Sequence, residues 1–224
     1  MATPNYVPAR TTEAVLATNK VIRNTYTLLS MTLLFSAVMA GVSTVLAMPP
    51  MTYLLGIGGA FVMMWFVLPR MANSANGLWV VFAITGLMGF ALGPLLNAYL
   101  SLANGPQIVG VALGGTGAIF LGLSGYALTT RKDFSFLGGF LISGLIVVLL
   151  AALANIFLQI PAMSLAISAL VILLMSGFIL HDTSRMVHEG RNANYLLMTV
   201  GLYISMFNIF VSLLHLLGFA SGDD

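Results

Sequence analysis

Long runs of apolar residues, separated by short polar breaks or breaks that contain proline and glycine, make up most of this chain. A helix needs about 20 mostly apolar residues to cross a hydrocarbon core of about 30 Å. Runs of about this length lie at about 26–48, 52–68, 78–97, 107–128, 136–157, 162–182 and 195–217. They are too long for strands and do not alternate with period two, so they predict seven transmembrane helices.

The composition favours the same interpretation. Hydrophobic residues make up 59% of the chain and charged residues 6%, whereas a soluble domain carries about 25% charged residues. So few charges cannot cover a surface that faces water. We therefore expect an all-α integral membrane protein with a single helical domain over residues 25–219. Cysteine is absent, which excludes disulfides and thiolate metal sites.

The basic residues fall only in every second interval between the predicted helices. They are Arg10, Lys20, Arg23, Arg70, Arg131, Lys132, Arg185 and Arg191. The positive-inside rule places these intervals in the cytoplasm. Residues 1–24 are then a flexible cytoplasmic tail, with a short interfacial helix near 12–23, and residues 220–224 form a periplasmic end. The net charge of only +2 gives no basic surface for nucleic acid.

Small residues recur at helical spacing on two of the predicted helices. Gly110, Gly114, Ala118 and Gly122 form a stripe on the fourth helix, and Gly89 and Gly93 repeat the spacing on the third. In lipid, such stripes allow the backbones of neighbouring helices to approach closely. Both stripes therefore predict helix packing.

Asp182 ends the sixth predicted helix, and the other apolar runs hold no acidic residue. A charge in a bilayer is expensive, so this carboxylate should face the bundle interior, water or a cation, where it could act as a proton sensor. Alternatively it lies at the membrane boundary and pairs with Arg185 at i+3. His181 points about 100° away from Asp182, so we expect it on a different face, at the interface.

The seventh predicted helix carries a polar stripe within an arc of about 80°. Its members are Ser205, Asn208, Ser212 and His215. Polar groups in lipid need partners, so this helix should be central in the bundle. The stripe indicates either a polar pathway or hydrogen bonding between helices. Asn97 and Asn155, near the ends of their helices, are expected to cap helices or to donate to a neighbouring helix.

The sequence gives no sign of catalysis. It lacks a His-Glu-x-x-His motif, a Gly-x-Ser-x-Gly elbow and a phosphate-binding loop. An intramembrane aspartyl protease would need two aspartates in the bundle, and only Asp182 lies close to it. We therefore expect no enzyme, no cofactor and no metal site.

Three stretches resemble the Bax inhibitor-1 (transmembrane Bax inhibitor motif) family. They are GLMGFALGPLLNAY at 86–99, YALTTRKDFSFLGGFL at 126–141, and residues 178–217 with their Gly-Leu-Tyr-x-x-x-x-Asn-x-Phe core. The resemblance extends from Arg23 to the end of the chain. It implies a seven-helix bundle with the last helix at its centre, in agreement with the polar stripe.

Further segments resemble the bacterial branch of the family, whose members modulate the membrane protease FtsH. They are VIRNTYTLLS, ANIFLQIPA and NIFVSLLHLLGFAS. The resemblance implies an inner-membrane regulator that inhibits FtsH, with FtsH and the HflK/HflC assembly around it as partners. The polar tail would enter the protease while the packed bundle resists extraction.

The family also implies an alternative, a pH-sensitive leak for calcium or other cations. Its channel-type members share protons between two aspartates, of which Asp182 matches the first, while Ser205 stands at the second position. The ion path would involve Asp182, Arg185, Ser205 and Asn208, with His181, Ser212 and His215 as secondary candidates. One carboxylate cannot form a coupled acid pair, which favours the regulator.

Overall fold

The computed structural model describes residues 12–74, 76–190 and 193–221. All regular structure in these ranges is helical, and seven spans are long and apolar enough to cross a membrane. The elements are α1 (Thr12–Val45), α2 (Met51–Val62), η1 (Met63–Val67), α3 (Leu68–Met71), α4 (Gly77–Leu100), α5 (Gly105–Thr130), α6 (Leu137–Leu158), α7 (Pro161–Glu189) and α8 (Tyr195–Ala220). The all-α membrane fold with seven spans is thus confirmed.

The second span, Met51–Met71, consists of three successive elements. A π-helical turn, η1, interrupts it immediately before α3, which carries Pro69 in its first turn. Proline has no N–H to donate and its ring crowds the preceding turn, so the helix widens there to accommodate it. The span therefore continues to Met71, three residues beyond its expected end.

Two helices, α1 and α7, extend well beyond their expected limits. α1 begins at Thr12, so the short helix expected near 12–23 is its first part, and the tail residues 1–11 lie outside the described residues. α7 continues to Glu189, where a loop was expected from residue 183. The extra turns are stabilised because Thr183, Ser184 and Met186 are buried.

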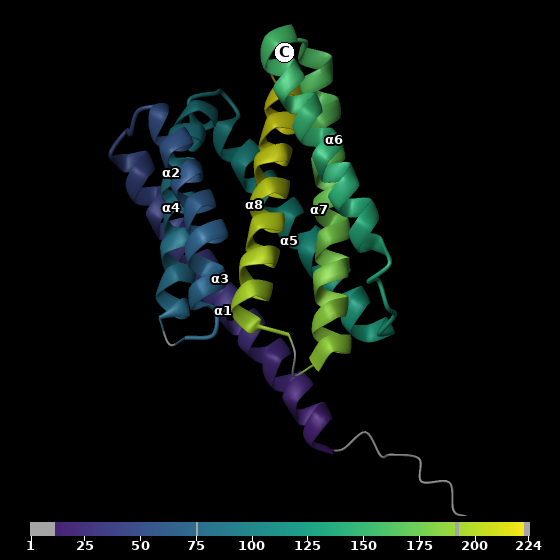
Figure 1. Cartoon of the computed structure of the whole chain (residues 1–224). Helices are drawn as coiled ribbons and strands as arrows, with labels where there is room; N and C mark the ends of the chain where they lie inside the picture. Colours follow the sequence, from purple (N-terminus) through teal and green to yellow (C-terminus); the bar gives the residue numbers. More distant parts are fainter. Residues whose placement is uncertain (1–11, 75, 191–192, 222–224) are drawn as a thin grey trace, which may run out of the picture.

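α8 lies at the centre of the bundle, as the polar stripe and the family resemblance both predict. It packs against α7, α5, α1 and α4, and Figure 1 shows it between the group of α1, α2 and α4 and the pair of α6 and α7. In the most apolar stretch of α8, 61% of the residues are buried, whereas in the corresponding stretch of α6 only 11% are. α6 is therefore a peripheral helix whose surface faces lipid.

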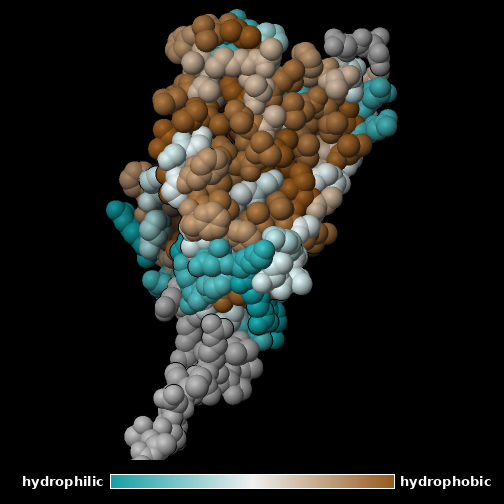
Figure 2. All heavy atoms as spheres, turned by 90° about the vertical axis from the view of Figure 1, so that its right-hand side faces the viewer, coloured by the Kyte–Doolittle hydropathy of each residue, from teal (hydrophilic) through white to brown (hydrophobic). Residues whose placement is uncertain are grey.

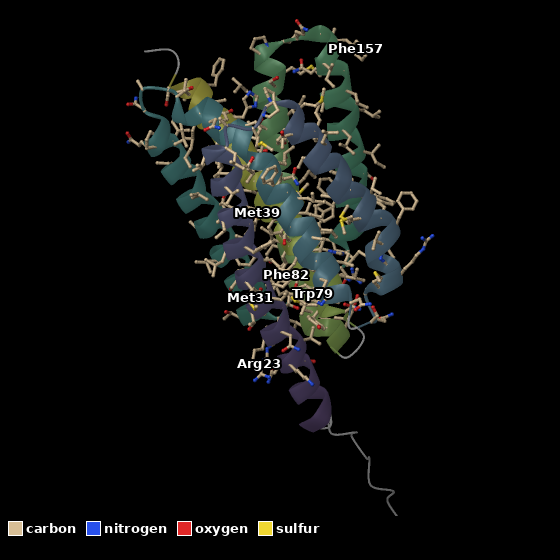
Figure 3. All side chains as sticks on the ribbon, turned by 90° about the vertical axis from the view of Figure 1, so that its left-hand side faces the viewer. Arg23, Met31, Met39, Trp79, Phe82 and Phe157 are labelled. Carbon is tan, nitrogen blue, oxygen red and sulfur yellow. The ribbon has the colours of Figure 1, made fainter. Side chains whose placement is uncertain are left out.

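The two ends of the bundle differ in polarity. The connections at 72–76, 131–136 and 190–194 lie at one end, which we call the basic end because Arg70, Arg131 and Lys132 are there. Figure 2 shows hydrophilic residues gathered at this end below a broad hydrophobic surface. α1 extends past the other helices here and carries Arg23, while Phe157 lies at the opposite, far end (Figure 3).

Glycines let α4 pack closely against α1. A Cβ atom at Gly93 would clash with the side chain of Ser43, and one at Gly89 would clash with the backbone of Ser36. At Gly86 a Cβ would come within 2.7 Å of the Phe35 ring. The structure thus bears out the close packing predicted from Gly89 and Gly93.

The packing predicted for the glycine stripe of α5 is wrong. Gly110, Gly114, Ala118 and Gly122 are all exposed, and a Cβ at any of the three glycines would meet no atom within 4 Å. α5 instead buries the opposite face, which carries Ile108, Ala112, Thr116 and Phe120. Ile108, Ala112 and Phe120 on that face belong to the hydrophobic core of the bundle, so the small residues face outward.

Candidate functional site

Asp182 lies in the interior of α7, seven residues before its end, and faces α8. Its side chain is 15% exposed, and its Oδ2 atom would be 2.7 Å from a Cβ at Gly201. The missing side chain at Gly201 therefore makes room for the carboxylate between the two helices. Ser205 lies one turn further along α8 and donates to the Gly201 carbonyl at 3.1 Å.

His181 is hydrogen-bonded to Asp182, with 3.1 Å between Nδ1 and Oδ1. We expected His181 on a different helix face from Asp182, and the two side chains nevertheless meet, because adjacent side chains of this length can bend toward each other along the helix surface. The other ring nitrogen, Nε2, lies 3.1 Å from where a Cβ at Gly138 would be. The imidazole thus fills the space between Asp182 and the start of α6.

Arg185, the partner expected for Asp182, pairs with Glu189 instead. Its Nε donates to Glu189 Oε1 at 2.7 Å and its Nη2 to Oε2 at 3.2 Å. Because α7 continues past Asp182, Glu189 lies at i+4 from Arg185, where a two-pronged bond is possible. Both side chains are more than a third exposed, so this pair is a surface feature of the basic end.

Ser184 fastens the α5–α6 connection to α7. Its hydroxyl donates to the Lys132 carbonyl at 3.1 Å and accepts from the Phe134 amide at 3.0 Å. Within the connection, hydrogen bonding from Ser135 lowers the pKa of the exposed Asp133 carboxyl. This connection is therefore held on α7 only two residues from Asp182.

Asn194 joins two other connections at the basic end. Its Oδ1 caps α8 by accepting from the Leu196 amide at 2.9 Å, and its Nδ2 donates to the Ala72 carbonyl at 2.9 Å. Sequence reasoning missed both Ser184 and Asn194. Asn194 stands immediately before an apolar run, which is a recognised N-cap signal, so it could have been identified.

Tyr203 links three helices at the middle of the bundle. Its hydroxyl donates to the Thr85 carbonyl of α4 at 3.2 Å. That proton is then engaged, so the 2.5 Å contact with Ser36 of α1 has the serine as donor. Tyr203 is 2% exposed. Its hydroxyl joins α8 to both α1 and α4 inside the bundle.

The side chains of the polar stripe of α8 do not form one shared site. Asn208 donates to the Ile204 carbonyl of its own helix at 2.8 Å, as Ser205 does to Gly201, and Ser212 is buried. His215 is bonded to Ser168 of α7 at 2.8 Å. Ser168 lies about 21 Å along α7 from Asp182 at 1.5 Å per residue, so the structure separates His215 from Asp182.

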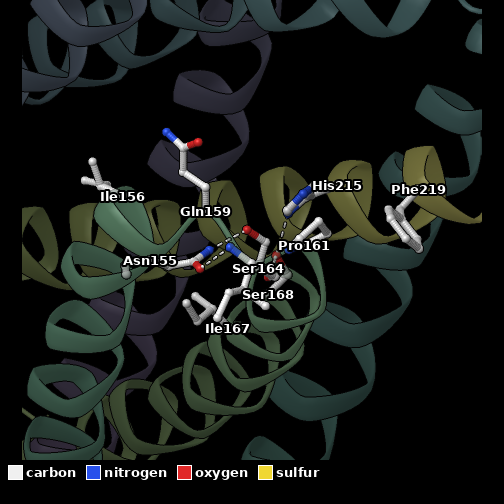
Figure 4. Close-up of a pocket in the computed structure, with 11 residues that line it drawn as sticks. Asn155, Ile156, Gln159, Pro161, Ser164, Ile167, Ser168, His215 and Phe219 are labelled. Carbon is white, nitrogen blue, oxygen red and sulfur yellow. Dashed lines mark hydrogen bonds between the residues drawn. The ribbon is translucent and has the colours of Figure 1, made fainter.

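A cavity of about 570 Å³ lies at the far end between α6, α7 and α8, and His215 is one of the residues that line it (Figure 4). Asn155 donates to Ser164 at 2.7 Å and accepts from the Ile160 amide at 3.1 Å, which confirms its expected role. Asn97 likewise donates from α4 to the Thr44 carbonyl of α1 at 3.0 Å. Ser168 donates to the Ser164 carbonyl, so its hydroxyl accepts from Nδ1 of His215.

The described residues form no group of three or more His, Asp or Glu side chains that could hold a metal ion. Among the described residues, the hydrogen-bonded His181–Asp182 pair lies near the basic end and His215 lies near the far end. Neither forms the two-carboxylate arrangement typical of channel-type members.

Comparisons with known proteins match almost the whole chain. The model of the family described as "Inhibitor of apoptosis-promoting Bax1" (Bax1-I) covers residues 18–222. The chain is 52% identical over 210 residues to "Modulator of FtsH protease YccA" of Escherichia coli K12, covering 94% of both chains. The identity and coverage are the same for "Inner membrane protein YccA" of E. coli O6:H1. An uncharacterized membrane protein of Vibrio cholerae is 46% identical over 224 residues, with both chains fully covered.

Proposed function

This chain belongs to the Bax1-I family, that of inhibitors of apoptosis-promoting Bax1, and we propose that it is an inner-membrane regulator of the FtsH protease. The observation that carries the proposal is the 52% identity over 94% of both chains with a protein named as a modulator of FtsH. The role is regulatory rather than catalytic. The chain binds FtsH and slows its turnover of other membrane proteins.

The mechanism starts at the basic end. α1 runs without a break from Thr12 to Val45 and extends past the other helices there. An ATP-dependent protease that engages the residues before Thr12 would therefore pull directly on α1. The force reaches the bundle through a single continuous helix.

α1 is held in the bundle mainly by α4 and α8. Its backbone lies against Gly89 and Gly93 of α4. Ser36 is bonded to the buried hydroxyl of Tyr203, and the Thr44 carbonyl accepts from Asn97. Extraction of α1 would break these contacts at once, in lipid, where freed polar groups find few partners. The chain would then occupy FtsH as a slow substrate.

The first experiment is a pull-down of the tagged full-length protein, asking whether FtsH and HflK/HflC are recovered with it. The second deletes residues 2–11, which precede α1, and measures FtsH turnover of another membrane protein in vesicles. Deletion of residues 222–224, at the other terminus, is the matched control.

We expect recovery of FtsH with the wild type, and restored turnover only with the 2–11 deletion. No recovery of FtsH would contradict the proposed function. If FtsH is recovered and the variant that lacks residues 2–11 still inhibits it fully, the tail mechanism is rejected and the inhibition is assigned to contacts between helices.

A pH-sensitive cation leak is the second candidate, and the placement of Asp182 favours it. This carboxylate is 15% exposed, pairs with a histidine and lies against Gly201 of the central helix. The test is calcium-dye flux in liposomes after a step from about pH 8 to about pH 6, across the range where histidine titrates. Asp182→Asn should abolish the pH response, whereas Asp133→Asn, in an exposed connection, should not. Equal responses of both variants and wild type would exclude this role for Asp182.

A further inference from the structure

A second cavity, also about 570 Å³, lies between α1 and α5 in the far half of the bundle, with α4 and α8 as its floor. We propose that this groove binds the acyl chain of one phospholipid from the leaflet at the far end. α1 and α5 form its two walls and hardly contact each other along it. Tyr203 and Phe207 of α8 lie at its base.

The length of the groove matches one leaflet. Its α1 wall runs from Leu33 to Val45, which is about 18 Å at 1.5 Å per residue. Half of a hydrocarbon core of about 30 Å is about 15 Å. The groove thus extends from the far membrane interface, near the exposed Val45, to the middle of the bilayer.

The groove is closed toward the basic end. There the ring of Tyr26 from α1 contacts that of Phe120 from α5, with 6.0 Å between their centroids. A transmembrane helix of a partner would have to cross both leaflets and would meet this closed end. A lipid tail that enters from the far interface ends at mid-bilayer and avoids it.

The chemistry of the lining suits a hydrocarbon chain. The hydroxyl groups in the wall are already bonded, Thr44 to the Ala40 carbonyl at 2.8 Å and Thr116 to the Ala112 carbonyl at 2.7 Å. Ser36 is likewise bonded to Tyr203. An occupant therefore needs no hydrogen-bonding groups. Gly41 of α1 and Gly117 of α5 line opposite walls of the groove, and a Cβ at either would meet no atom within 4 Å.

The experiment uses the full-length protein in vesicles of phosphatidylethanolamine and phosphatidylglycerol. The probe is a phosphatidylglycerol with a photoreactive diazirine at the end of one acyl chain, and mass spectrometry locates the labelled residues. Gly117→Leu and, from the opposite wall, Gly41→Leu fill the groove. Gly114→Leu is the matched control, because it adds the same side chain to an open face of α5 outside the groove.

We expect selective labelling of Met206 and Phe207, which belong to the central helix and are at most 9% exposed. Both groove-filling variants should lose this labelling, while Gly114→Leu keeps it and all three retain the wild-type melting temperature. Labelling spread over the outward face of α6 without enrichment in α8 would overturn the proposal. If the wild type shows no labelling of α8 and forms a dimer that Gly117→Leu loses, the proposal is overturned, and a second copy of the chain is the occupant of the groove.

Discussion

Two neighbouring helices, α4 and α5, carry the same small-residue spacing and use it in opposite ways. On α4, Gly89 and Gly93 lie against the backbone and side chains of α1, and no larger residue fits there. On α5, Gly110 and Gly114 face outward and touch nothing. One stripe forms a packed interface, and the other leaves an open surface.

The difference shows what determines the use of a glycine stripe in a membrane. Without a hydrophobic force between helices in lipid, close packing requires a complementary partner surface. α1 presents small serines, Ser36 and Ser43, to α4. α5 buries its other face, with Phe120 and Ile108, in the hydrophobic core, so its small residues turn toward lipid.

The largest effect should come from Gly93→Val, compared with Gly114→Val. The valine on α4 has no room beside Ser43 and must push α1 away, which should destabilise the fold by about 3 kcal/mol or more. The valine on α5 enters open space. Thermal unfolding in detergent, followed by circular dichroism, should show a large fall in Tm for the first variant and little change for the second. Equal shifts would mean that both stripes are packed.

A smaller effect is expected for Tyr203→Phe, which removes the hydroxyl that joins α8 to the packed side of the bundle. Ser36 would lose the partner to which it donates at 2.5 Å, and the stability should fall by about 1–2 kcal/mol. Tyr126→Phe is the control, since Tyr126 lies on α5 and is 46% exposed. If unfolding in a denaturing detergent affects both variants alike, the hydroxyl of Tyr203 has no structural role.

The smallest predicted effect has the opposite sign. Gly114→Ala should stabilise the protein by about 0.5–1 kcal/mol, because alanine restricts the unfolded chain more than glycine and its Cβ meets no atom within 4 Å. Gly89→Ala should destabilise, since its Cβ would clash with the backbone of Ser36. The same unfolding assay separates the two. A stabilising Gly89→Ala would contradict the close α1–α4 packing.

Hydrophobic patterning was sufficient to predict the seven spans and the central position of α8, because both follow from the length and polarity of single segments. Spacing also predicted the stripe of α5 but not the direction in which it faces, which depends on the larger residues opposite. The partner of Arg185 was mispredicted because α7 continues past Asp182 and brings Glu189 into reach. Local sequence does not reveal that extension, since it depends on Ser184 binding the α5–α6 connection.

The most direct test of the proposed regulation measures how fast FtsH degrades a labelled membrane substrate in vesicles with ATP, in the presence of this protein. The wild type and Gly114→Val should slow degradation equally. Gly93→Val, with its loosened α1–α4 interface, should itself be degraded and lose the inhibition. Inhibition by Gly93→Val equal to that by the wild type would contradict the resistance mechanism, and unchanged degradation with the wild type would contradict the regulation of FtsH.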